Sequence, residues 1–97
     1  MSAKSTATIN DPIAHDVWSF AAKDGSRHKV EIAFGRPFEV SKGDRPEWAC
    51  PLFIQGNTRG VKNVRGVGPV DALLNAAAIV RTVLDGLDDA TPREGND

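Results

Sequence analysis

The chain has 97 residues, a formal net charge of −1 and a single cysteine. This length suits one domain, and one cysteine excludes a framework of intrachain disulfides. The nearly balanced charge provides no overall field to attract nucleic acid or an anionic membrane. Because the first residues carry no apolar signal segment and no apolar run approaches the ~20 residues that span a bilayer, we expect a cytoplasmic protein of bacterial style.

The two ends of the chain are polar. Residues 1–11 are small and polar apart from Ile9, and residues 88–97 are acidic in balance, with four acidic residues against one arginine. Both segments have the composition of disordered tails. We therefore expect a disordered N-terminal tail over 1–11, a single domain over 12–87 and an acidic disordered tail over 88–97. Neither tail is expected to contribute to the core.

Residues 13–22 and 26–34 alternate between apolar and polar side chains with the period of a β-strand. The three residues between them end in a glycine and have the composition of a hairpin turn. A three-residue loop, with that glycine in the left-handed conformation, sets Trp18 opposite Val30. A two-residue loop would set the tryptophan opposite Glu31, so the longer loop is expected because it puts both apolar faces on one side.

A third strand is expected over residues 47–55 and a weaker fourth over about 60–66. The inward face of the third strand is expected to carry Trp48, Cys50, Leu52 and Ile54. Pro51 has no N–H to donate to a neighbouring strand, so its amide side should face an edge or a bulge.

Residues 69–87 have helical periodicity and predict one long helix, with Pro69 at its first position and Asp71 in its first turn. Its apolar arc spans roughly 200°, more than one side of a sheet covers. The surplus is expected to form a subunit interface, unless residues 38–40 or the tail fold over it. The candidate interface residues are Leu74, Ile79 and Val83.

These elements predict an α+β domain, an antiparallel meander of three to four strands followed by one long C-terminal helix packed on one face. The expected core residues are Trp18, Phe20, Val30, Ile32, Trp48, Cys50, Leu52, Ile54, Leu73, Ala77, Val80 and Leu84.

Residues that could carry out metal or nucleophilic chemistry are few. His15 and His28 fall on opposite faces of the expected hairpin, and no metal-ligand spacing occurs in the sequence, so we expect no metal and no cofactor. Cys50 shares its face with apolar residues, which is typical of a buried and unreactive thiol. A Cys50–His28 pair on one sheet face stays open as an alternative, but no catalytic residue is assigned and we do not expect an enzyme.

The glycine-rich segment 56–68 carries three basic residues and ends at the start of the expected helix, where backbone amides favour anions. Neither a Walker loop nor a G-x-G-x-x-G motif is present. The alternative interpretation is a turn and a solvated edge strand whose charges discourage pairing. Nucleic acid is not an expected ligand because the aromatic residues are assigned to the core. The candidate ligand-binding residues are Arg59, Lys62, Arg65, Gly66 and Gly68.

From Trp48 onward the chain resembles a family of small bacterial proteins of unknown function. Members of that family carry W-x-C, then I-x-G, then a glycine-rich stretch leading into a V-D-[AS]-L helix. The matching segments here are Trp48-Ala49-Cys50, Ile54-Gln55-Gly56, Gly66-Val67-Gly68 and Val70-Asp71-Ala72-Leu73-Leu74. A Gly-Pro pair stands between the Gly-Val and Val-Asp pairs of this sequence. The resemblance implies the α+β architecture and a bacterial origin, and it implies no activity.

The function expected from the sequence is a non-enzymatic protein-interaction module that self-associates, most simply as a homodimer. The wide apolar arc of the helix and the lack of catalytic groupings motivate this hypothesis. The alternative is a binder of small anionic ligands that uses the basic segment 56–68. A cysteine-dependent enzyme is the third and weakest hypothesis.

Overall fold

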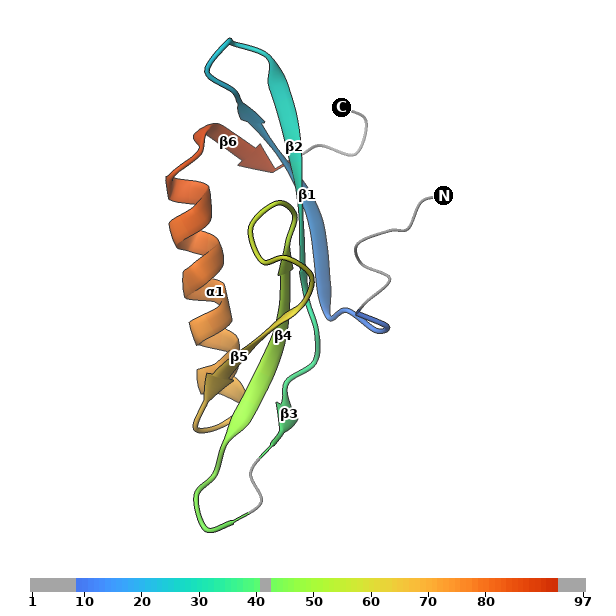
Figure 1. Ribbon diagram of the computed structural model, residues 1–97, viewed down its shortest axis with the longest axis vertical. Helices are drawn as coiled ribbons and strands as arrows, with labels where there is room; N and C mark the ends of the chain where they lie inside the picture. Colours follow the sequence, from blue (N-terminus) through green and yellow to red (C-terminus); the bar gives the residue numbers. More distant parts are fainter. Residues whose placement is uncertain (1–8, 41–42, 93–97) are drawn as a thin grey trace.

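The structure is a computed structural model in which residues 9–40 and 43–92 are described. Within these residues, a six-stranded antiparallel sheet carries one helix on one face (Figure 1). The elements in chain order are β1 (Ala14–Ala21), β2 (Arg27–Phe34), β3 (Phe38–Glu39), β4 (Trp48–Ile54), β5 (Lys62–Gly66), α1 (Pro69–Asp85) and β6 (Asp88–Pro92). The expected α+β class is confirmed, and the short strands β3 and β6 are additions to the expected meander.

The β1–β2 hairpin has the expected register. Trp18 lies opposite Val30 and Phe20 opposite His28. The three-residue loop ends at Gly25, whose φ of 90° is left-handed and therefore favours glycine. The apolar residues of both strands consequently share the face that carries the helix.

Strand β4 lies in the middle of the sheet. β5 pairs along one edge of β4, whereas β2 and then β3 pair along the other. Where β2 gives way to β3, the amide of Gly35 donates to the carbonyl oxygen of Pro51 at 2.8 Å. The amide and carbonyl of one strand residue point to the same edge, so the missing N–H of Pro51 faces this break. The prediction that Pro51 faces an edge or a bulge is confirmed.

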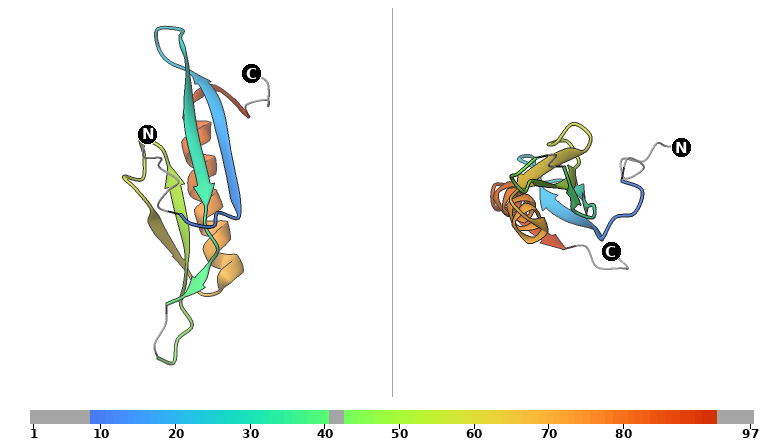
Figure 2. Two further views of the ribbon diagram at one scale, coloured as in Figure 1. Left: turned by 90° about the vertical axis from the view of Figure 1, so that its right-hand side faces the viewer. Right: turned by 90° about the horizontal axis from the view of Figure 1, so that it is seen from below.

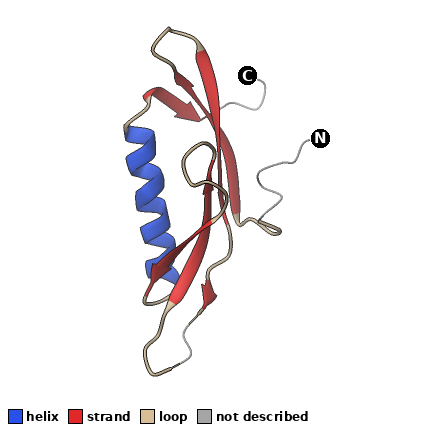
Figure 3. Cartoon of the chain, viewed as in Figure 1, coloured by secondary structure: helices blue, strands red, loops and turns tan. Residues whose placement is uncertain are grey.

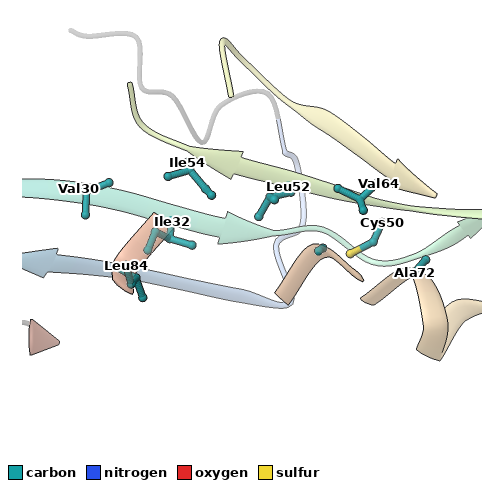
Figure 4. Close-up of a cluster of buried hydrophobic side chains, with 9 residues drawn as sticks. Val30, Ile32, Cys50, Leu52, Ile54, Val64, Ala72 and Leu84 are labelled. Carbon is teal, nitrogen blue, oxygen red and sulfur yellow. The ribbon is translucent and has the colours of Figure 1, made fainter. Parts of the chain in front are cut away.

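The main core lies between the sheet and α1 (Figure 4). The buried members of this cluster are Val30, Ile32, Cys50, Leu52, Ile54, Val64, Ala72, Ala76 and Leu84. Most of the expected core residues belong to it or pack against it, but Ala77 does not. Ala72 and Ala76 are fully buried instead, because the helix is rotated so that small side chains face the sheet and allow a close approach.

The second face of the sheet carries a small buried cluster, which the sequence analysis did not predict. Ala33 and Phe53 are buried there together with Ile9, which is only 7% exposed. The view from below shows α1 on one side of the sheet and the chain near residue 10 on the other (Figure 2). The assignment of 1–11 to a tail outside the core is therefore wrong at Ile9, while residues 1–8 lie outside the described residues.

The segment after the helix is a strand, so the assignment of residues 88–97 to a disordered tail is wrong for 88–92. β6 returns to the sheet and pairs antiparallel with β1, with Ser19 opposite Thr91 and Trp18 opposite Pro92 (Figure 3). Asp89 lies 2.8 Å from Arg27 in an ion pair. Composition suggested a solvated tail, but the open edge of β1 offers backbone hydrogen bonds that favour a strand. Residues 93–97 lie outside the described residues.

Candidate functional site

A groove of about 310 Å³ lies between α1 and the β1–β2 half of the sheet. We call it the α1–β1 groove. It is lined by Ala14, His15, Asp16, Trp18, Ile32, Phe34, Ala77, Val80, Arg81 and Leu84. Its size is at the lower end of the range of ligand pockets, and its lining is mainly apolar with a few polar groups at the rim.

The groove exists because α1 packs mainly on β4 and β5. The helix thus leaves part of the apolar face of β1 and β2 uncovered. Trp18, Ile32 and Phe34 form the sheet side of the groove, and Ala77 and Val80 contribute to the helix side. Small alanines at positions 14 and 77 leave this space unfilled.

The β1 side of the groove is an open sheet edge. The amide of Ala22 donates to Ser26 across the hairpin, so even-numbered β1 residues point their backbone groups at β2. The odd-numbered residues His15, Val17 and Ser19 point their backbone N–H and C=O groups away from β2, toward the outer edge of the sheet. β6 pairs with β1 from Trp18 onward, and among the described residues no strand pairs with the outer edge of 14–17.

The side chain of Asp16 satisfies one backbone amide on this edge that a neighbouring strand would otherwise bind. Its Oδ1 accepts a hydrogen bond of 2.8 Å from the outward-pointing amide of Val17. Asp16 forms no ion pair within residues 9–40 and 43–92. The cation of the groove, Arg81, lies 3.7 Å from Asp85 on its own helix. The rim therefore presents one carboxylate without a cationic partner beside backbone groups available for pairing.

The basic residues proposed for anion binding do not meet in one cavity of the described chain. Arg65 donates to Glu47 at 2.6 Å, and this pair lines a shallow hollow with Arg45. Lys62 is exposed on the edge strand β5, and Arg59 lies in the preceding turn with a left-handed φ of 56°. The arrangement resembles the solvated edge strand that the sequence left open as the alternative.

The two glycines assigned to the same site have structural roles. Gly66 allows α1 to start directly against the end of β5, since a Cβ there would lie 2.7 Å from the Cα of Ala72. Gly68 is the N-cap of α1. The amide of Val67, which an anion would need, already donates to the Asp71 carboxylate at 2.9 Å. Asp71 therefore occupies the helix start with its own negative charge.

The three candidate interface residues separate into two groups. Ile79 and Val83 are half-buried and pack against the main core. Leu74 is 61% exposed, and Val70 on the same helix face and Val67 just before the helix are more exposed still. We call Val67, Val70 and Leu74 the helix-start patch. The hollow lined by Arg65, Glu47 and Val67 adjoins it.

Cys50 and His28, the pair left open as a catalytic alternative, lie far apart in the sheet. Cys50 is fully buried, and its Sγ lies 3.6 Å from the carbonyl oxygen of Gly35. Burial raises the pKa of the Cys50 thiol, which disfavours the reactive thiolate. His28 sits at the hairpin end of β2, whereas Cys50 lies beyond the other end of that strand. The structure does not bring the Cys50–His28 pair together.

A serine, a histidine and an aspartate do meet at the exposed hairpin tip. Ser26 Oγ donates to Asp24 at 2.6 Å and lies 3.0 Å from His28 Nε2. The hydrogen bonds from Ser26 lower the pKa of Asp24. The order differs from a catalytic triad, in which the carboxylate orients the histidine, and this cluster stabilises the turn.

The groove and the open edge were missed by sequence reasoning, although a signal was present. Asp16 and Ala14 occupy the inward-facing positions of a strand whose other inward residues are large and apolar. A charged and a small residue at such positions indicate that this end of the strand is not covered by a helix.

Within the described residues, no group of three or more potential ligands could hold a metal ion, and no helix is long and apolar enough to cross a membrane. Comparisons with protein-family models, with curated proteins and with solved structures found no match to this chain. The resemblance to the bacterial family stays a prediction.

Proposed function

We propose that this protein is a non-enzymatic, cytoplasmic protein-interaction module that self-associates through the helix-start patch. The observation that carries the proposal is the exposure of three aliphatic side chains around the start of α1, with Val67 at 70%, Val70 at 66% and Leu74 at 61%. Single exposed apolar residues are ordinary, but several at one end of a helix favour an interaction surface.

The occupant we propose for this patch is a second copy of the chain. A two-fold contact requires a surface that is complementary to itself. Val67 lines the hollow, whose rim carries both signs of charge, on Arg65 and Glu47, while Val70 and Leu74 are exposed on the first turns of α1. The aliphatic side chains of one copy can enter the hollow of the other while the charges alternate across the contact.

The test is sedimentation velocity over a series of protein concentrations with the L74E variant beside the wild type. We expect the wild type to shift from monomer to dimer as concentration rises, and L74E to remain monomeric because the contact would bury its carboxylate without a partner. The matched control is T82E, which places the same charge on an exposed position of another helix face. A wild-type protein that stays monomeric at high micromolar concentration contradicts the proposal.

The alternative of a small-anion binder is supported by fewer observations. Lys62 and Arg59 are exposed, but Arg65 is paired with Glu47 and the amide of Val67 is paired with Asp71. These pairings favour the interaction module over the anion binder.

A further inference from the structure

We infer that the outer edge of β1 over residues 14–17 is a docking site for an extended peptide segment of a partner, which adds to the sheet as a short antiparallel strand. This site lies on the edge of β1, beside the part of α1 between Ala77 and Leu84, whereas the helix-start patch lies at the first turns of that helix. The two sites have different occupants. The inference is independent of the proposed self-association.

The backbone of β1 supplies the main recognition groups. His15 and Val17 point their amide and carbonyl groups outward, in line with Ser19, which pairs with Thr91 of β6. β6 shows that this edge accepts an antiparallel strand, and its pairing ends at Trp18. Residues 14–17 of this edge offer four positions, or roughly 13 Å of extended chain, to a strand that pairs with them.

The side chains of β1 beside this edge determine which residue types are complementary in the partner strand. Residues opposite one another on paired strands share a face, so the residue opposite Asp16 faces the groove. Because Asp16 has no cationic partner among the described residues, a lysine or arginine is complementary at that position. The residue opposite Ala14 lies over the groove floor at Ile32 and Phe34, where an aliphatic side chain fills the space that alanine leaves.

The remaining two residues of the partner strand lie opposite His15 and Val17, on the second face. His15 is already hydrogen-bonded to Glu31 at 2.7 Å. Small polar or β-branched residues are therefore sufficient at the two partner positions on this face. Read from its N-terminus, the partner segment is therefore polar, basic, polar, aliphatic. On binding, a carbonyl of the partner replaces the Asp16 carboxylate on the amide of Val17 and frees that carboxylate for the cation.

The test is titration of the ¹⁵N-labelled full chain with the capped hexapeptide Ser-Thr-Lys-Thr-Ile-Ser, followed by amide chemical shifts. We expect the largest changes at the amides of His15 and Val17 and at the indole of Trp18. Replacing the peptide lysine by glutamate should weaken binding by roughly 5-fold, as an exposed charge pair turns into a repulsion. The D16K variant should prefer the glutamate peptide over the lysine peptide.

Two controls test the backbone pairing itself. V17P removes the outward amide without removing a bond to β2, whereas V17T keeps the amide and the β-branched shape, so only V17P should abolish binding. If V17P does not fold, the peptide with both threonines N-methylated gives the same test on the wild-type protein. The inference is overturned if shifts at residues 14–17 are absent at millimolar peptide, or if they persist with the N-methylated peptide.

The L74E variant separates this inference from the proposed function. Peptide binding should be unchanged in L74E, because its substitution lies outside the groove. If the amide signals of residues 14–17 shift with protein concentration alone, and V17P removes that shift, the occupant of the edge is a second copy of the chain. The peptide inference is then wrong. Failure of dimerisation in sedimentation, with peptide binding intact, rejects only the self-association.

Discussion

At the scale of single residues, Cys50 has the buried position that its strand pattern predicted. The thiol lies on the inward face of β4, is fully buried and is surrounded by aliphatic side chains (Figure 4). Its position was predictable because alternation along the strand places Cys50 on the same face as Leu52 and Ile54. The separation of Cys50 from His28 was not predictable, since it depends on how β2 and β4 are aligned.

We expect native Cys50 to resist iodoacetamide at mildly alkaline pH. Burial removes access and raises the thiol pKa, so the thiolate fraction at a given pH is smaller than for an exposed cysteine. The measurement is the rate of alkylation by mass spectrometry, with the double variant C50S/S26C, which has its only thiol on the exposed hairpin tip, as control. Equal rates for the two thiols would contradict this prediction.

Gly66 and Gly68 show why a residue type does not reveal its role. Both were candidates for an anion site, because glycines near a helix start often approach a ligand with their backbone. In the structure Gly66 approaches another part of its own chain, the first turn of α1. Sequence spacing alone cannot distinguish these two uses, since both need a residue without a Cβ.

At the scale of elements, the contact between β5 and α1 depends on the absence of a side chain at Gly66. We expect G66A to destabilise the fold by about 2 kcal/mol, because its Cβ would overlap the backbone of Ala72 and Asp71. Urea unfolding measures this loss. In contrast, Gly68 has open space and the extended φ of −161°, so G68S should be neutral or stabilising as a better N-cap.

If G66A and G68S have equal unfolding midpoints, the close approach at Gly66 does not contribute to stability as argued. The comparison is well matched because both glycines precede α1 and neither has a φ in the left-handed region.

The helix also shows a limit of periodicity. Its start at Pro69 and its apolar arc were predictable from the sequence, whereas the helix ends at Asp85, two residues before the predicted end. Its rotation about its own axis was not, because a 200° arc does not specify which part faces the sheet. The structure turns Ala72 and Ala76 inward. This rotation takes Ile79 and Val83 to the core and leaves Val70 and Leu74 exposed.

At the scale of the whole molecule, apolar side chains are buried on both faces of the sheet. On the second face Ile9 packs with Ala33 and Phe53. We expect I9A to lower the free energy of unfolding by about 2–3 kcal/mol, the usual cost of truncating a buried isoleucine. The matched control is I13A, since Ile13 is 42% exposed and its truncation should cost far less. Equal costs in urea unfolding would show that Ile9 does not contribute to the folded state.

The sequence by itself determined the local structure of this protein. Alternation and turn residues predicted the hairpin and its register, the third strand and the helix, because these features depend on neighbours along the chain. Only the tertiary structure decided how the elements meet. It placed β6 on the edge of β1 and Ile9 on the second face, and it left the α1–β1 groove and the edge at 14–17 open. These depend on contacts between distant segments, which composition and periodicity do not encode.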